Sequence, residues 1–368
     1  MREELERSAP EREGMDGERL NAAFRLLERE AETGEIPGGV ALVGRYGRIV
    51  ASFYTGLSVA TDFAIQPVQE DTIYDCASLT KVVVTLPLIL QLIDGGEIRL
   101  GDPVCRFIPT FAAEGKTEVT VRQLLSHNSG LAAYTDLYSH GWALEQIKES
   151  VWSEKLQHEP GAGYVYSDLN FIALGEIASI LFGKSLETAA YENVFKPLGM
   201  TESGYRPDTG LKPRIAATEF LFGSYRWGDV HDKNTYAMGG VSGHAGMFST
   251  AADLAKYAAM WLDGGRYPGG RLLSEAVVRA ATRNCSSLPK TNRGLGWVLK
   301  GDAWDASGDL FSPASYGHTG FTGTSLFMDP TTEVFVVLLT NRVHFGREKS
   351  VARLRDCFHN AVAAAVLD

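Results

Sequence analysis

Ser78-Leu79-Thr80-Lys81 is the most informative stretch of this 368-residue chain, because it places a serine three residues before a lysine. The mostly apolar residues 82–90 follow and predict a buried helix that opens here. Positions i and i+3 share one helix face, so the hydroxyl and the amine should be neighbours. Burial favours a neutral amine, which could help to take the serine proton. This pattern indicates a covalent serine hydrolase, although a helix N-cap beside a solvent-reaching lysine fits the same four letters.

The composition is that of an ordinary globular protein. Of the residues, 45% are hydrophobic and 22% are charged. The formal net charge is −10 and no Lys/Arg-rich block occurs, which argues against a nucleic-acid partner. Residues 1–7 are charged rather than apolar, so we read no secretion signal there, and no apolar run is long enough to cross a bilayer. We therefore expect a cytoplasmic protein that acts on a small molecule and binds neither nucleic acid nor membranes.

Both ends of the chain predict helices beside antiparallel strands, whereas the middle is mostly helical. The expected helices span residues 16–32 and 348–367, and the expected strands span residues 40–43, 49–54, 325–329 and 334–339. The simplest packing is an α+β fold in which residues 15–75 and 290–368 form one sheet domain, flanked by the N- and C-terminal helices. Residues 76–289 would form an inserted, mostly helical domain, with the active site in the cleft between the two domains.

Two later motifs could supply partners for the serine. Residues 166–168, Tyr-Ser-Asp, close a loop rich in glycine and proline. A phenol near an ammonium group ionises more readily and could take the serine proton. Residues 318–320, His-Thr-Gly, stand just before an expected strand in a glycine-rich segment. Such glycines let a ligand or another backbone approach closely, and backbone N–H groups there could form part of an oxyanion hole.

In this order and at these separations, the three motifs resemble those of the serine β-lactamase and penicillin-binding superfamily. The match is to the branch that holds class C β-lactamases, low-molecular-weight D-Ala-D-Ala peptidases and β-lactamase-like esterases. The resemblance covers residues 15–345 and implies the β-lactamase/transpeptidase-like fold. It also implies that Ser78 is the nucleophile that becomes acylated, and that Lys81 and Tyr166 transfer the proton. The oxyanion hole would consist of the backbone N–H groups of Ser78 and Phe321. The family uses no metal, and we expect no cofactor.

Two departures from the family pattern bear on the substrate. Asp168 stands where the family usually has asparagine, and an ionised aspartate accepts hydrogen bonds but cannot donate them to a substrate carbonyl. It should pair with Lys81 and raise the pKa of that amine, which moves the role of base toward Tyr166. His318 opens the motif that ends at Gly320, and it stands where β-lactamases usually have lysine. A histidine is mostly neutral at pH 7. Both departures weaken the expected recognition of carboxylate-bearing acylamides.

We therefore expect a carboxylesterase that acts on short-chain acyl esters through an acyl-enzyme. A D-Ala-D-Ala-type peptidase or a weak class C-like β-lactamase is the first alternative, and an acyltransferase is the second. A catalytically silent penicillin-recognition or assembly module is the non-enzymatic alternative, and its sequence would lack at least one of Ser78, Lys81 and Tyr166. The sequence leaves open the oligomeric state and the identity of the ester.

Overall fold

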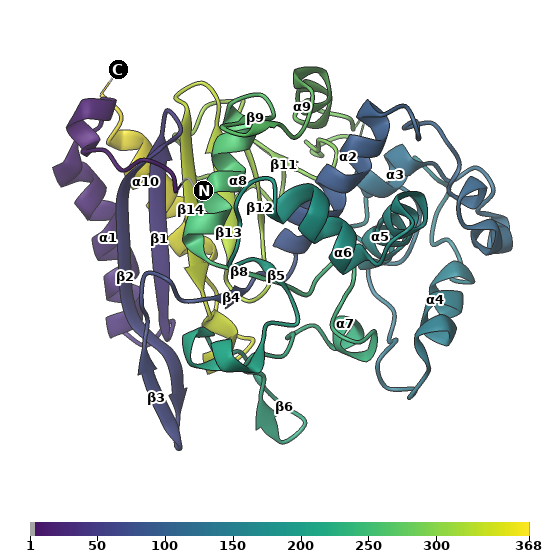
Figure 1. The fold of residues 1–368 in the computed structure, drawn as a ribbon, viewed down its shortest axis with the longest axis horizontal. Helices are drawn as coiled ribbons and strands as arrows, with labels where there is room; N and C mark the ends of the chain where they lie inside the picture. The colour runs from purple at the N-terminus through teal and green to yellow at the C-terminus, as the bar shows by residue number, and fades with distance from the viewer. Residues whose placement is uncertain (1–3, 287, 368) are drawn as a thin grey trace.

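The computed structural model describes residues 4–286 and 288–367. A seven-stranded antiparallel sheet forms the left half of Figure 1, in the order β11-β12-β13-β14-β1-β2-β3. Its strands are β1 (Gly38–Arg45), β2 (Arg48–Thr61), β3 (Ala64–Pro67), β11 (Val298–Leu299), β12 (Tyr316–Thr319), β13 (Ser325–Asp329) and β14 (Val334–Thr340). Strands from the two ends of the chain meet at the centre, where β1 pairs with β14.

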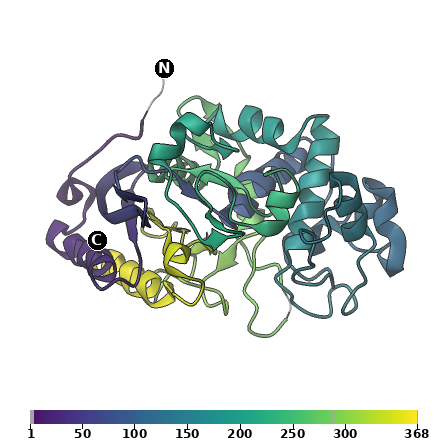
Figure 2. The same cartoon turned by 90° about the horizontal axis from the view of Figure 1, so that it is seen from below.

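Both faces of this sheet are buried at its centre, in β1 and β14, and the alternation along β1 shows how. Val40 and Leu42 belong to one hydrophobic cluster, whereas Ala41 and Val43 belong to the other, as expected when successive side chains point to opposite faces. Helix α8 (Ala251–Leu262) covers the first face. Helices α1 (Gly17–Glu32) and α10 (Ala352–Ala364) lie side by side over the second face, at the left of Figure 2.

The predicted α+β architecture is confirmed. The expected helix at residues 16–32 is α1, whose first turn is capped by the Asp16 carboxylate through the N–H groups of the second and third helical residues. The expected C-terminal helix is α10, and all four expected strands lie within the observed ones. The division into domains at residues 76 and 290 stays a prediction. Helix α8 comes from the middle of the chain, yet it packs on the sheet.

The remaining elements are mostly helical, and all of them except the 15-residue α5 are short. The α-helices are α2 (Leu86–Asp94), α3 (Val121–Leu125), α4 (Leu144–Trp152), α5 (Asp168–Phe182), α6 (Leu186–Ala190), α7 (Lys233–Ala237) and α9 (Glu275–Ala281). The other helical turns are η1 (Pro10–Glu13), η2 (Lys81–Thr85), η3 (Val104–Arg106), η4 (Pro109–Gly115), η5 (Tyr191–Phe195), η6 (Thr209–Arg214) and η7 (Arg342–Phe345). The small strands are β4 (Tyr74–Asp75), β5 (Gly204–Tyr205), β6 (Phe220–Leu221), β7 (Ser224–Tyr225), β8 (Met247–Ser249), β9 (Arg266–Tyr267) and β10 (Gly270–Arg271).

No single helix in the described ranges is long and apolar enough to cross a membrane. One pair, residues 168–182 with 186–195, reaches that length and composition only when both helices are counted, and the pair is bent by 76°.

Ser78 lies in the short turn between β4 and η2, and β4 holds that turn in place. Strand β4 pairs with β8, and the N–H of Cys76 donates to the carbonyl of Met247 at 2.9 Å, which anchors the chain two residues before the serine. The helix then begins with a π-helical turn, a feature often found at functional sites. Pro87 stands in the first turn of α2, but α2 continues η2 with helical backbone at Thr85 and Leu86, so the missing N–H does remove a helical hydrogen bond. The carbonyl of Val82, five residues before the proline, instead accepts a hydrogen bond from the Tyr257 hydroxyl at 2.5 Å.

Gly44 offers a test of how tightly the central strands pack. A methyl group at Gly44 would stand 1.9 Å from Cζ of Phe335, its partner in β14. The ring is fully buried and cannot move without displacing its neighbours. We expect Gly44→Ala to lower the free energy of unfolding by about 1–3 kcal/mol in urea denaturation.

Gly101→Ala is the matched control, because no described residue other than its two chain neighbours lies within 4 Å of the added methyl group. We expect this control to change the free energy of unfolding by less than about 0.5 kcal/mol. Equal losses in the two variants would contradict this account of the β1–β14 contact.

Candidate active site

Lys81 is held by three acceptors from three separate segments. Its Nζ donates to Ser78 Oγ at 3.0 Å and to the carbonyl oxygen of His244 at 3.1 Å. It also lies 2.7 Å from Oδ1 of Asp168, the first residue of α5. The side chain is fully buried. An ammonium group has three N–H donors, so this geometry satisfies each of them and fits the charged form of the lysine.

The electrostatics agree with that geometry. Burial alone would lower the pKa of Lys81, but the charges and hydrogen bonds of Asp168 and Tyr166 outweigh it and raise the pKa overall. The first expectation from the sequence, that burial makes this amine neutral, is therefore wrong. The second expectation, that Asp168 pairs with Lys81 and raises its pKa, matches the structure. Lys81 remains a cation at neutral pH.

The phenol ring of Tyr166 lies among three other rings above the ammonium. Lys81 Nζ is 4.9 Å from the centroid of this ring. The ring centroids of His127, Trp304 and His318 lie 4.6, 5.8 and 5.9 Å from that of Tyr166. Such close ring contacts restrict the rotamers open to the side chain. The structure therefore brings Tyr166 to the Ser78–Lys81 pair and holds it there.

His318 is buried in β12 and does not carry the charge that a lysine would. Burial, followed by the charges of Arg293 and Lys81, lowers the pKa of His318 to about 3. The ring is thus neutral at physiological pH. Its Nδ1 lies 2.8 Å from the carbonyl oxygen of Thr319, an acceptor only, so Nδ1 donates there. The buried Nε2 is left as an acceptor with no hydrogen-bond partner in the described part of the chain.

Gly320 lies against the segment that precedes the serine. A Cβ at this position would stand 2.5 Å from the carbonyl oxygen of Cys76 and 2.1 Å from Oγ1 of Thr324. Only a residue without a side chain permits this approach. Thr322 Oγ1 donates to the carbonyl of Asp75 at 2.7 Å, and Thr324 Oγ1 donates to that of Cys76 at 3.1 Å. These hydrogen bonds tie the loop after β12 to the approach to Ser78.

This contact brings together the two segments that carry the expected oxyanion-hole donors, Ser78 and Phe321. Across residues 4–286 and 288–367, neither backbone N–H makes a hydrogen bond within the protein. Both donors are therefore free to bind a substrate oxygen. The roles assigned to Ser78, Lys81, Tyr166, Asp168, His318, Gly320 and Phe321 remain predictions, but the structure gathers all seven residues at one place.

Several groups at this site were not found from the sequence. One is the backbone carbonyl of His244, which the residue type does not signal. The imidazole Nε2 of His244 lies 3.0 Å from Oδ1 of Asp232, which holds the loop before β8 in place. The hydroxyls of Thr322 and Thr324 act on backbone carbonyls and belong to no motif that the sequence analysis used. The one feature of the sequence that points to both threonines is their place in the glycine-rich segment.

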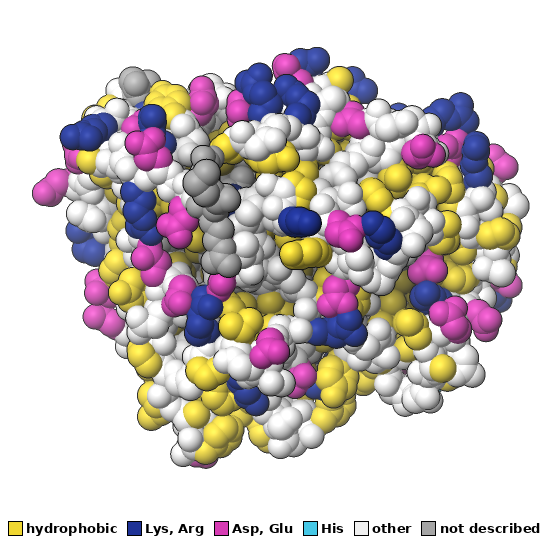
Figure 3. Space-filling model, viewed as in Figure 1, with side chains coloured by type: hydrophobic (Ala, Val, Ile, Leu, Met, Phe, Trp, Pro, Cys, Tyr) yellow, Lys and Arg dark blue, Asp and Glu magenta, His cyan; other side chains and the backbone are white. Residues whose placement is uncertain are grey.

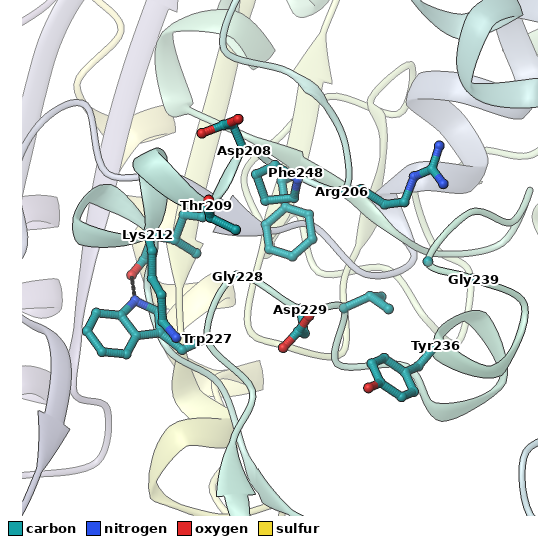
Figure 4. A pocket seen from close by; sticks show the side chains of 14 residues that line it. Arg206, Asp208, Thr209, Lys212, Trp227, Gly228, Asp229, Tyr236, Gly239 and Phe248 are labelled. Carbon is teal, nitrogen blue, oxygen red and sulfur yellow. Dashed lines mark hydrogen bonds between the residues drawn. The ribbon is translucent and has the colours of Figure 1, made fainter.

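A cavity of about 580 Å³ lies apart from these residues (Figure 4). It is lined by residues between 206 and 248, including Trp227, whose indole N–H donates to the carbonyl of Ile215 at 2.9 Å. Lys212 Nζ stands 4.9 Å from the centroid of the same indole ring. Neither Ser78 nor Tyr166 lines this cavity, so the chemistry, rather than the size of the cavity, locates the candidate active site.

The described residues contain no group of three or more His, Cys, Asp or Glu side chains arranged to hold a metal ion. The site instead offers a hydroxyl, a phenol, an ammonium group and free backbone N–H groups. These are the groups that acyl transfer through a covalent serine intermediate requires.

Comparison with known proteins identifies the family. The family model described as "Beta-lactamase" matches residues 23–358. A protein of Escherichia coli O157:H7 named "Putative D-alanyl-D-alanine carboxypeptidase" is 34% identical over 380 aligned residues, which cover 92% of this chain and 86% of the relative.

Solved structures share the fold at lower sequence identity. A penicillin-binding protein homologue from Caulobacter crescentus superposes with a TM-score of 0.77 at 23% identity, covering 96% of this chain and 99% of that one. The hydrolase EstCE1, described as having promiscuous acyltransferase activity, gives a TM-score of 0.75 at 22% identity, with 94% and 99% covered. The length of the family match and the identity to the E. coli relative decide the assignment: this chain belongs to the β-lactamase family of serine hydrolases.

Proposed function

We propose that this chain is a carboxylesterase that hydrolyses short-chain acyl esters through an acyl-enzyme on Ser78. The observation that carries the proposal is the 2.7 Å ion pair between Lys81 and Asp168 beside the serine. This ion pair keeps the lysine charged. It also engages Asp168, which stands where the family usually offers an asparagine amide to its acylamide substrates.

The proposed first step is attack of Ser78 Oγ on the ester carbonyl carbon. Lys81 is a cation whose three donors are all engaged, so it cannot serve as the base. Tyr166 is the remaining ionisable group beside the ammonium, and we assign its phenolate form the role of base that accepts the proton of the Ser78 hydroxyl. The ammonium, 3.0 Å from Oγ, stabilises the developing alkoxide. The leaving alcohol takes the proton back, and water then releases the acyl group.

The rim of the site suits an apolar acyl group. Trp304 and Phe321 are large aromatic residues with 57% and 45% of their surface exposed. Phe321 follows Gly320 directly, and Trp304 stacks on Tyr166 at 5.8 Å. Exposed aromatic rings near a reaction centre provide apolar contact area for a substrate. With His318 neutral, no permanent charge at that position demands a carboxylate.

A D-Ala-D-Ala-type carboxypeptidase or weak β-lactamase is the second candidate. The E. coli relative carries that peptidase name. In addition, the Arg342 guanidinium lies 4.8 Å from the centroid of the Phe321 ring and brings a positive charge to the rim. A substrate carboxylate could pair with this guanidinium.

An acyltransferase would use the same acyl-enzyme with an alcohol in place of water. A silent module is disfavoured because Ser78, Lys81 and Tyr166 are all present and in contact range.

We propose a small molecule as the partner, and the cytoplasm as the location remains part of this proposal. On the face drawn in Figure 3, Lys and Arg side chains are intermixed with Asp and Glu side chains. Such a surface lacks the continuous basic stripe that tracks a phosphate backbone.

The first prediction compares three substrates: a short-chain p-nitrophenyl ester, a chromogenic cephalosporin and a peptide ending in D-Ala-D-Ala. We expect kcat/KM for the ester to exceed that for the other two by at least tenfold, a difference of about 1.4 kcal/mol in transition-state stabilisation. Ser78→Ala, which lacks the nucleophile, should be inactive on all three and should not be labelled by a fluorophosphonate. Faster peptide or cephalosporin turnover would favour the second candidate. Product analysis with added alcohols would reveal acyl transfer.

The second prediction concerns Asp168→Asn, which removes the carboxylate that holds Lys81 in its charged form. Burial then dominates and the pKa of Lys81 falls. We expect the pH profile of kcat/KM to gain a rising step below the ordinary lysine value of about 10.4, because deprotonated Lys81 becomes available as a base. The new amide can also donate to an acylamide, so cephalosporin turnover relative to ester turnover should rise by roughly tenfold.

Asp229→Asn serves as the matched control, because Asp229 is an exposed acid that lines the cavity of Figure 4 instead of contacting Lys81. It should leave the pH profile and the substrate ratio unchanged. If Asp168→Asn behaved like this control, the ion pair would not determine either property.

A further inference from the structure

A buried arginine on the C-terminal helix lies behind the loop that carries Phe321. Arg355, in α10, is 9% exposed. Its Nη2 donates to the carbonyl oxygen of Gly320 at 3.1 Å and to that of Thr324 at 2.8 Å, and both hydrogen bonds are buried. Its Nε has no hydrogen-bond partner among the described residues. No carboxylate of those residues forms an ion pair with this guanidinium.

The hydrogen bond to Gly320 acts on the peptide group that contains the Phe321 N–H. The carbonyl of Gly320 and the N–H of Phe321 belong to one planar trans peptide unit, so they point in opposite directions. Fixing the oxygen therefore fixes the direction of the N–H. Because the donor is a cation, the hydrogen bond also polarises the peptide and makes its N–H a stronger donor. Arg355 thus acts on the N–H from the far end of the same peptide.

The other side of this loop is already fixed. The hydroxyls of Thr322 and Thr324 bind the carbonyls of Asp75 and Cys76, and Gly320 packs directly on Cys76. The loop is consequently held between the segment that delivers Ser78 and helix α10. Arg355 is the contact from α10 that sets how the Gly320–Phe321 peptide faces the serine.

Among the described residues, Arg355 forms no ion pair with a carboxylate, and only the charge of the adjacent Asp356 acts in its favour. A buried cation without a carboxylate partner costs free energy in the resting protein. Burial, followed by the charge of Arg342, lowers the pKa of Arg355 to about 9, which leaves it protonated at neutral pH. A negative charge forms on the substrate oxygen in the tetrahedral intermediate but is absent from the bound ester. An interaction of this kind raises kcat rather than lowering KM.

We propose that Arg355 is a positioning residue for catalysis: it orients and polarises the Gly320–Phe321 peptide so that the Phe321 N–H stabilises the oxyanion formed at Ser78. This inference rests on the proposed acyl-enzyme function. It adds a residue that lies 277 positions after the serine in sequence, outside the three motifs, to the groups on which the rate depends.

The test uses two substitutions of the full-length protein. Arg355→Gln retains an N–H donor but removes the charge, whereas Arg355→Lys retains the charge with a different donor geometry. We expect Arg355→Gln to lower kcat for the p-nitrophenyl ester by about 10- to 100-fold, approaching the loss of one oxyanion donor, with KM within about twofold of the wild-type value. Arg355→Lys should recover at least about threefold of the lost kcat, because it restores the charge.

A spectroscopic measurement separates positioning from general damage. In the acyl-enzyme, hydrogen bonds from an oxyanion hole weaken the ester carbonyl bond and lower its infrared stretching frequency. Isotope-edited difference spectra of the acyl-enzyme should therefore show this band at a higher frequency in Arg355→Gln than in the wild type, with Arg355→Lys between them. If Arg355→Gln did not fold at the assay temperature, the comparison of Arg355→Lys with the wild type would provide the test, with a smaller shift in the same direction.

Leu354→Ala is the control for helix packing. Leu354 is the neighbouring residue on α10, is 4% exposed and belongs to the cluster on the far face of the sheet. We expect this control to lower Tm while kcat and the carbonyl band stay at their wild-type values. An unchanged kcat and carbonyl band in Arg355→Gln, or the same kcat loss in Leu354→Ala, would overturn the inference. Failure of a fluorophosphonate to label wild-type Ser78 would instead overturn the proposed function itself.

Discussion

The candidate site depends on the burial of one ammonium group. Lys81 is fully enclosed, and a buried charge is tolerated only when each of its donors finds an acceptor. Its acceptors come from the turn that begins η2, from the first residue of α5 and from the loop before β8. These segments are far apart in the chain, so the lysine fixes their relative positions. One of these contacts is to Ser78 Oγ, so the lysine both joins the segments and positions the nucleophile.

A second charge of the same sign lies behind the loop that carries Phe321. Arg355 is also buried, but its acceptors are backbone carbonyls rather than a carboxylate. The two cations therefore differ in how far their charge is compensated before a substrate binds. Lys81 is ion-paired with Asp168 before any substrate arrives, whereas Arg355 forms no ion pair with a carboxylate of the described residues. This asymmetry suits a reaction in which the nucleophile must be ready in advance and negative charge appears later on the substrate oxygen.

Local patterns in the sequence predicted much of this arrangement. The spacing of Ser78 and Lys81 gave their contact, and the apolar stripes gave α1 and α10, because both follow from the period of a helix. The four-residue motif by itself predicts a neutral Lys81, whereas the aspartate at position 168, which departs from the family pattern, predicts the ion pair that keeps the lysine charged. Arg355 could not be found, because a single arginine within an amphipathic helix carries no signal of what it faces. Contacts to backbone carbonyls, such as that of His244, leave no trace in residue types.

The pairing of β1 with β14 also has a consequence for folding during synthesis on the ribosome. Gly39 is paired with Thr340, so the strand that is synthesised early must wait for about 300 further residues before its partner exists. During that interval only β2 can cover one edge of β1, and the other edge presents free backbone groups flanked by valine and leucine side chains. Such an edge readily pairs with other chains. The N-terminal hairpin is thus the segment of a nascent or truncated chain that most needs shielding until translation is nearly complete.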